Sequence, residues 1–170
     1  MNAAVKHPVS IGKPTLKDAM RQLAGGVCVI TAGAGEERTG LTATSAVSLS
    51  MAPPTMIVCI NREASALPII QLRGHFCINV LASGHRDVAD RFAGRGGVKG
   101  AARYADAKWS RLATGALALD DAVASIDCEV EEFIERHSHV IVLGAVRALQ
   151  VRSGRALIYG QGQYGALAPT

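Results

Sequence analysis

The chain has 170 residues, of which 49% are hydrophobic, 19% charged and 4% aromatic, and its formal net charge is +4. This length favours one domain with a substantial core, and the composition excludes a chain that stays disordered. The positive charge comes without the interleaved aromatic residues of a stacking platform, so we expect no nucleic-acid partner.

The apolar runs of the sequence are short. None reaches the ~20 residues that a membrane-spanning helix needs. Residues 1–14 also lack the long apolar stretch of a signal peptide. We therefore expect a cytoplasmic protein that does not bind a membrane.

The first half of the chain predicts short helices and strands. Thr15 can cap a short helix, which Gly25 and Gly26 end. Residues 27–33 (VCVITAG) then predict a strand, and residues 39–50 (TGLTATSAVSLS) predict a single returning strand. The elements expected next are a strand over 55–61, a helix over 64–74 and a strand over 75–82.

The second half of the chain is richer in strands. Ser83 can cap a helix over 83–94, in which Val88 and Phe92 face one way. Residues 94–107 are rich in glycine and predict an irregular excursion. β-Branched or alternating runs then predict four strands, over 108–113, 123–135, 138–151 and 155–164. Strands in hairpin succession favour a mainly β, antiparallel barrel over a doubly wound parallel sheet.

Basic residues are concentrated in the middle of the chain. A solvated basic face near an anionic small ligand is the favoured interpretation of this cluster. Its members are Arg86, Arg91, Arg95, Lys99, Arg103, Lys108 and Arg111.

Two motifs suggest other functions, and both are disfavoured. Residues 160–165 (GQGQYG) match the dinucleotide motif GxGxxG, but too little chain follows for the helix and second strand that the motif needs. His137 and His139 would share one face of a strand, as metal ligands can, but no further ligand stands near them. We expect no metal. Taken alone, His139 is more often a strand-end residue than a catalytic one.

The segment 40–50 (GLTATSAVSLS) places hydroxyl groups among small apolar residues. A solvent-facing strand would carry its hydroxyls on one face, but here Thr42 and Thr44 would lie on one face of the strand and Ser45 on the other. Ala43 and Ala46 leave room for a flat ligand to approach the backbone. Such a surface suits a polar heteroaromatic ring or a phosphate.

Six blocks of the sequence, in order and with fitting gaps, carry a family resemblance. They are AMRQLAGGVCVIT, GLTATSAVSLSMAPPTMIVCIN, ASALPIIQLRGHFCINVL, DRFAG, SHVIVLGAV and LIYGQGQYGAL. From about Leu16 to about Leu167 the chain resembles the flavin reductase-like proteins, which have an FMN-binding split barrel. The resemblance implies an antiparallel split β-barrel over residues 15–170, preceded by an N-terminal extension over residues 1–14.

The resemblance also implies a site for flavin and nicotinamide. The strand that would lie along the flavin carries Thr42, Ala43, Thr44, Ser45 and Ser48. The residues that would contact the flavin phosphate or border its pocket are Asn61, Arg62, Ser65, Asn79, Val80, Leu81 and Arg86. Two residues would neighbour the nicotinamide: His139, which is the catalytic candidate, and Tyr164.

The function implied is an NAD(P)H-dependent flavin reductase, an oxidoreductase that transfers hydride from NADH or NADPH to FMN or FAD. It would be a homodimer that supplies reduced flavin to a partner monooxygenase. Two alternatives stay open at this point. One is a flavoprotein that retains FMN and reduces another acceptor, such as a Co(II) corrinoid of cobalamin biosynthesis. The other is a non-catalytic barrel that binds flavin or haem.

Overall fold

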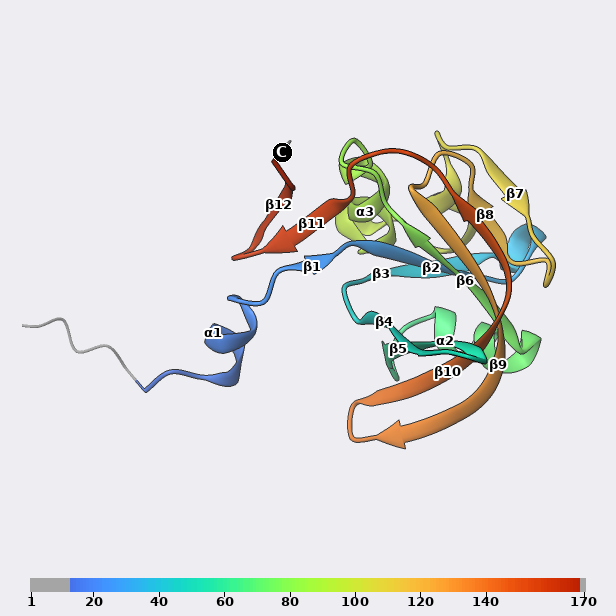
Figure 1. The fold of residues 1–170 in the computed structure, drawn as a ribbon, viewed down its shortest axis with the longest axis horizontal. Helices are drawn as coiled ribbons and strands as arrows, with labels where there is room; N and C mark the ends of the chain where they lie inside the picture. Colours follow the sequence, from blue (N-terminus) through green and yellow to red (C-terminus); the bar gives the residue numbers. More distant parts are fainter. Residues whose placement is uncertain (1–12, 169–170) are drawn as a thin grey trace, which may run out of the picture.

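The computed structural model describes residues 13–168, which form a mainly β structure (Figure 1). The helices are α1 (Leu16–Met20), α2 (Ala66–Arg73) and α3 (Arg86–Phe92), with short 3₁₀ helices η1 (Gly35–Glu37), η2 (Arg95–Gly97) and η3 (Gly100–Tyr104). The strands are β1 (Gly25–Gly26), β2 (Cys28–Ala32), β3 (Thr39–Ala43), β4 (Ala46–Met51), β5 (Pro54–Asn61), β6 (His75–Val80), β7 (Trp109–Arg111), β8 (Leu117–Leu119), β9 (Ala124–Arg136), β10 (His139–Val151), β11 (Leu157–Gly160) and β12 (Gln163–Ala166).

A seven-stranded antiparallel sheet, in the order β3-β2-β6-β9-β10-β5-β4, forms the body of the molecule. β3 and β4 are its two edges, yet only Thr44 and Ser45 separate them in the chain. Three Cα–Cα steps span at most about 11 Å, so the sheet has to curl until its edges meet at this end. The curled sheet is a split barrel (Figure 1). The prediction of a mainly β, antiparallel split barrel is confirmed.

The prediction of one continuous strand over 39–50 is wrong. Ala43 ends β3 opposite Cys28 of β2, whereas Ala46 begins β4 opposite Val58 of β5. Between them the hydroxyl of Ser45 donates to the carbonyl of Cys59 at 2.9 Å, which helps to hold the chain as it crosses from one edge to the other. Local alternation of residues does not report such a change of pairing partner.

The barrel core and a second apolar cluster lie on opposite faces of β2. Ile30 points into the barrel, where it packs with Phe76 and Val142. Val29 points the other way and packs with the cluster that contains Phe92 of α3. All five residues of β2 are therefore buried. A strand buried on both faces has no polar alternation, which explains the run VCVITA.

Several predicted element ends differ in the structure. His85, not Ser83, precedes α3, and its Nδ1 accepts a hydrogen bond from the amide of Ala82 at 3.1 Å. Gly25 and Gly26 form β1, which pairs with β11. The strand β8 was not predicted, and the run 155–164 divides into β11 and the start of β12.

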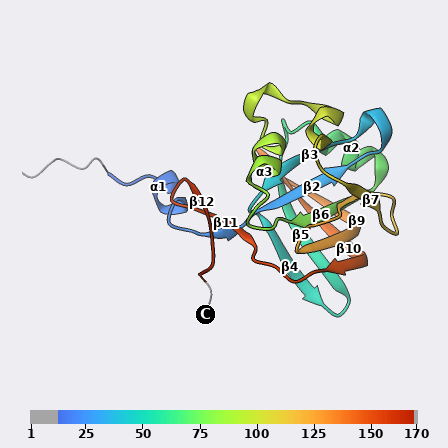
Figure 2. The same ribbon diagram turned by 90° about the horizontal axis from the view of Figure 1, so that it is seen from above.

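α1 and the hairpin β11–β12 project from one end of the barrel (Figure 2). The predicted cap of α1 is confirmed, because Thr15 and Asp18 form a reciprocal capping box. The apolar residues of this helix stay largely exposed, with Leu16 at 78% and Met20 at 53%. Within residues 13–168, no helix has the length and apolar character needed to cross a membrane.

Candidate functional site

Two cavities share a wall on β3. The larger one has a volume of about 660 Å³ and extends toward η1, the start of α2 and η3. The smaller one has a volume of about 220 Å³ and extends toward β11 and β12. Thr42 of β3 and Ala93, which follows α3, line both cavities. We call the two cavities together the β3 groove.

The larger cavity is lined by three cationic side chains, those of Arg38, Lys99 and Arg103, and by three carboxylates, those of Glu36, Glu37 and Glu63. The carboxylate of Glu37 is paired with Arg73. Arg103 is fixed in place, since its guanidinium donates to the carbonyls of Gly40 and Val98. Burial lowers the pKa of this guanidinium. The group still stays charged at neutral pH, because the ordinary pKa of arginine is very high. Arg38 lies 5.3 Å from the ring centroid of Tyr104.

The Nε atom of Arg38 is buried and has no hydrogen-bond partner in the described structure. A buried donor without a partner is costly, so an acceptor from a ligand would stabilise it. The hydroxyl of Ser65 also lines this cavity, 3.2 Å from the hydroxyl of Thr39. Hydroxyls and guanidinium groups together suit the oxygens of a phosphate.

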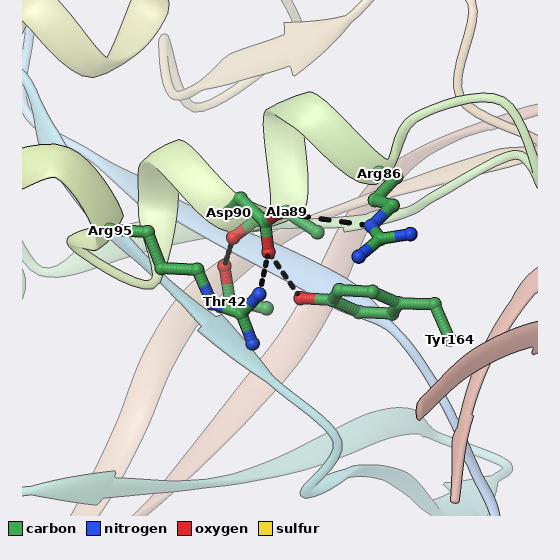
Figure 3. A network of polar contacts seen from close by, with 6 residues as sticks. All are labelled: Thr42, Arg86, Ala89, Asp90, Arg95 and Tyr164. Carbon is green, nitrogen blue, oxygen red and sulfur yellow. Dashed lines mark hydrogen bonds and ion pairs between the residues drawn. The ribbon is translucent and has the colours of Figure 1, made fainter. Parts of the chain in front are cut away.

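The hydroxyls of segment 40–50 divide into groups with different surroundings. Thr42 donates to the carbonyl of Ala89 at 2.6 Å and so ties β3 to α3 (Figure 3). Ser45 donates to Cys59, as described above. Thr44 is exposed, and together with Ala43 it lines the smaller cavity. Ser48 is exposed on β4 and lines neither cavity.

A polar network joins α3, Arg95 and β12 beside the smaller cavity (Figure 3). The hydroxyl of Tyr164 donates to Oδ1 of Asp90 at 3.1 Å, and Arg95 pairs with the same oxygen at 3.1 Å. Arg86 lies 3.9 Å from the other carboxylate oxygen. Burial, together with the hydrogen bond to Asp90, raises the pKa of the Tyr164 phenol. Tyr164 and Arg95 line the smaller cavity.

His139 lies apart from the β3 groove. It begins β10, opposite Asn61 of β5, and its exposed ring has Nδ1 2.9 Å from the hydroxyl of Ser138. Asn61 accepts a hydrogen bond from the amide of Glu63 at 2.9 Å, which turns the chain toward α2. Neither His139 nor Asn61 lines the two cavities, so the structure does not bring His139 together with Tyr164 in the groove.

Other predicted site residues also lie outside the groove. Asn79 has no exposed surface, and its Oδ1 accepts hydrogen bonds from the amide of Leu119 at 2.7 Å and the hydroxyl of Ser125 at 2.9 Å. It therefore joins β6 to β8 and β9 in the interior. Leu81 is fully buried. Val80 is half-buried against the barrel core. Arg62 pairs with the carboxylate of Glu135 at 2.9 Å on the surface.

Comparison with known proteins relates this architecture to a single family. The family model described as "Flavin reductase like domain" matches residues 20–168. The chain belongs to the flavin reductase-like family. A curated relative, FMN reductase (NADH) RutF 2 of Methylorubrum extorquens, is 40% identical over 161 residues, which cover 94% of this chain and 92% of the relative.

Solved structures of the same family share the fold of this flavin reductase-like protein. BorF, the flavin reductase component of a bacterial two-component tryptophan halogenase, superimposes with a TM-score of 0.83 at 29% identity, covering 91% of this chain and 98% of BorF. The NADH:FAD oxidoreductase SgcE6 of Streptomyces globisporus, in complex with NAD and FAD fragments, superimposes with a TM-score of 0.82 at 26% identity, covering 91% and 92%. The resemblance to this family noted in the sequence is confirmed.

The β3 groove of this flavin reductase-like protein fits a flavin nucleotide. Its larger cavity offers cations, a hydroxyl and an unpaired guanidinium nitrogen for a phosphate, and its β3 wall offers small residues for a flat ring. Sequence reasoning did not name Arg38 or Asp90. It did single out the basic cluster, from which Arg95, Lys99 and Arg103 enter the groove. Within residues 13–168, no group of three or more His, Cys, Asp or Glu side chains could hold a metal.

Proposed function

We propose that this protein is an NADH-dependent flavin reductase that binds flavin in the β3 groove. The observation that carries the proposal is the larger cavity, with its three cationic side chains and the buried, unpaired Nε of Arg38 beside a wall of small residues. The relative named FMN reductase (NADH) supports FMN as flavin and NADH as reductant. FAD is kept as an alternative flavin, because SgcE6 is named an NADH:FAD oxidoreductase.

Each end of the groove has its own task in this proposal. Lys99, Arg103 and Ser65 would hold the flavin phosphate in the larger cavity. Ala43 and Thr44 would lie along the flavin ring in the smaller cavity, where Thr44 has an exposed side chain that can donate a hydrogen bond. Thr42 acts indirectly, because its bond to Ala89 fixes the spacing between β3 and α3.

The bound flavin supplies the hydride-accepting chemistry, and the protein supplies orientation and electrostatics. Small residues on β3 let both rings approach within the short distance that transfer needs. Cationic groups of the larger cavity favour the anionic nucleotide. No side chain has to donate or accept a proton in the hydride transfer itself.

His139 keeps its predicted place beside the nicotinamide only as a proposal that rests on the family resemblance. It lies outside both cavities, at the start of β10. If it binds NADH, His139→Ala should raise the KM for NADH about tenfold and leave flavin affinity unchanged, since it would remove one hydrogen bond. Equal NADH dependence in a well-folded variant would remove His139 from the site.

We further propose that the protein supplies reduced flavin to a separate oxygenase. BorF is named the flavin reductase component of a two-component tryptophan halogenase, and another solved relative is named nitrilotriacetate monooxygenase component B. We also keep the cytoplasm as its location, because all four cysteines are free thiols, as expected in a reducing compartment.

A homodimer is proposed from an apolar surface that the chain itself leaves uncovered. Val47, Ile57 and Leu143 are aligned across β4, β5 and β10, and Cys59 is aligned with Ile141. We call these five residues the outer apolar face. Val47 is 54% exposed and the others are half-buried. A second copy is the occupant that would cover such a face without needing another partner.

The helix α1 supports the same proposal. It has five residues, none of them buried, and it projects from the barrel (Figure 2). So short a helix is marginal unless tertiary packing stabilises it. Its exposed residues Leu16 and Met20 therefore suit contact with a partner subunit.

Flavin binding and reduction can be tested separately. We expect the purified protein to oxidise NADH only when FMN or FAD is present. We also expect it to bind FMN about tenfold or more tightly than riboflavin, which lacks the phosphate. Lys99→Ala should reduce this ratio, and Lys108→Ala, which removes an exposed lysine outside the cavity, should not. Equal binding of FMN and riboflavin by the wild-type protein would refute the assignment of the larger cavity.

A further inference from the structure

Asp90 is an unexpected residue to find beside a groove for anionic nucleotides. A carboxylate at such a site repels the substrate unless something offsets its charge. Here Arg95 and Arg86 flank it at 3.1 Å and 3.9 Å, and the Asp90 side chain is 24% exposed. The carboxylate is therefore neutralised locally and is free to act as a fixed acceptor for other groups.

The group that Asp90 holds is the phenol of Tyr164 (Figure 3). β12 is an outer strand of the small sheet β1-β11-β12 and pairs with β11 alone. Its other residues, Gln163, Gly165 and Ala166, are exposed, while Tyr164 turns inward. Among residues 13–168, the Tyr164–Asp90 bond is the one side-chain hydrogen bond from β12 to the rest of the molecule.

The aromatic ring of Tyr164 also contacts two guanidinium groups and a second aromatic ring. The guanidinium carbons of Arg86 and Arg95 lie 5.6 Å and 5.8 Å from its centroid. Tyr159 meets it edge-on, with ring centroids 5.3 Å apart. Both guanidinium groups are bound to Asp90, so one carboxylate orients the phenol and the two cations around it. Tyr164 and Arg95 then line the smaller cavity, whose lining also includes Thr44.

We propose that Asp90 is a positioning residue that sets Tyr164 and Arg95 as the wall of the NADH subsite. The inference rests on the proposed function, in which the flavin ring lies along β3. NADH then has to enter from the side opposite β3, where it meets the aromatic ring and the cation that Asp90 holds. A planar ring and a fixed guanidinium suit the nicotinamide and the diphosphate of that substrate. Asp90 itself touches neither.

The test uses the full-length protein and follows flavin reduction by stopped-flow. Asp90→Ala should raise the NADH concentration for half-maximal reduction about five- to tenfold, because Tyr164 and Arg95 lose their common partner. The dissociation constant of FMN, measured by fluorescence quenching, should change less than twofold. Asp87→Ala removes the same charge from an exposed position of α3 and should behave as wild type.

Two further variants separate positioning from general stability. Asp90→Asn keeps an oxygen that can accept from the Tyr164 hydroxyl, so it should recover part of the NADH affinity that Asp90→Ala loses. Tyr164→Phe combined with Asp90→Ala should be no worse than Asp90→Ala alone, because both act through one contact. Melting curves of all variants monitor folding.

Three results would overturn the inference. One is wild-type NADH dependence in Asp90→Ala. Another is an equal loss of FMN and NADH affinity in that variant. The third is full additivity of Asp90→Ala and Tyr164→Phe. A wild-type protein that fails to oxidise NADH with any flavin would instead refute the proposed function, so the two failures are distinguishable.

Discussion

β2 and β10 are similarly apolar in sequence, but they have different surroundings in the fold. All five residues of β2 are buried, because one face lies in the barrel core and the other is covered by α3 and its aromatic neighbours. In β10 the inner residues Val140 and Val142 are buried, while Ile141 and Leu143 on the other face are only half-buried. The comparison teaches that an apolar run predicts two faces that avoid water, but not what covers them.

The largest expected effect contrasts the same substitution on these two strands. Ile30→Ala should lower the free energy of unfolding by about 2–5 kcal/mol, because it truncates a fully buried side chain of β2 and leaves a cavity in its place. The loss should be the same at every protein concentration. Ile141→Ala should destabilise in a concentration-dependent way, since a second copy covers it in the proposed homodimer. Urea unfolding at several concentrations measures both; a concentration-independent loss for Ile141→Ala would contradict the comparison.

A charge on the outer apolar face should separate the subunits without unfolding them. Val47→Lys would bury an unpaired ammonium in the proposed interface, which costs roughly 3 kcal/mol and weakens association at least about a hundredfold. Sedimentation equilibrium measures the change. Asp87→Lys, an exposed change on α3, which packs against β2 and β3, is the control. A monomeric wild-type protein would refute the proposal that a second copy covers the outer face of β10.

Thiol reactivity distinguishes a face covered within the chain from one covered by a second copy. Cys28 of β2 is buried, and burial raises its pKa to about 11, so it should react slowly with a thiol reagent in every folded form. Cys59 on the outer apolar face is half-buried in one chain. If the proposed homodimer forms, Cys59 should be protected in the wild-type protein and should react in Val47→Lys. Rapid labelling of Cys59 in the wild type would show that the face is open.

The smallest expected effect concerns Tyr164, which packs at the margin of the apolar cluster on the outer face of β2 and joins β12 to α3. The pKa of its phenol is raised in the folded protein, so folding favours the protonated form. Its contribution to stability is therefore full below the unfolded pKa of ~10 and is lost as pH rises through the folded value. Tyr164→Phe should show a shallower fall in stability above about pH 10. Identical alkaline profiles would exclude a contribution from this phenol.

Much of the fold could be predicted from local patterns. The strands β2, β5, β6, β9 and β10 follow from β-branched and apolar runs, and the start of α1 follows from the capping residue Thr15. The succession of hairpins predicts an antiparallel barrel. The more specific prediction of a split barrel came from the family resemblance. The basic cluster indicated an anionic ligand, and Lys99 and Arg103 do line the larger cavity.

Local sequence patterns therefore predict most of the strands, the segment that carries the hydroxyls, and the family, but not β1, β8 or the break between β3 and β4. Only the tertiary structure decided that residues 39–50 divide between the two edges of one sheet, and that Thr42 and Ser45 use their hydroxyls to hold the backbone. It also placed Asn79 in the interior and Arg38 in the groove. The physical reason is that alternation and propensity are local, whereas pairing partners, sheet curvature and the approach of Asp90 to Tyr164 depend on contacts between residues far apart in the chain.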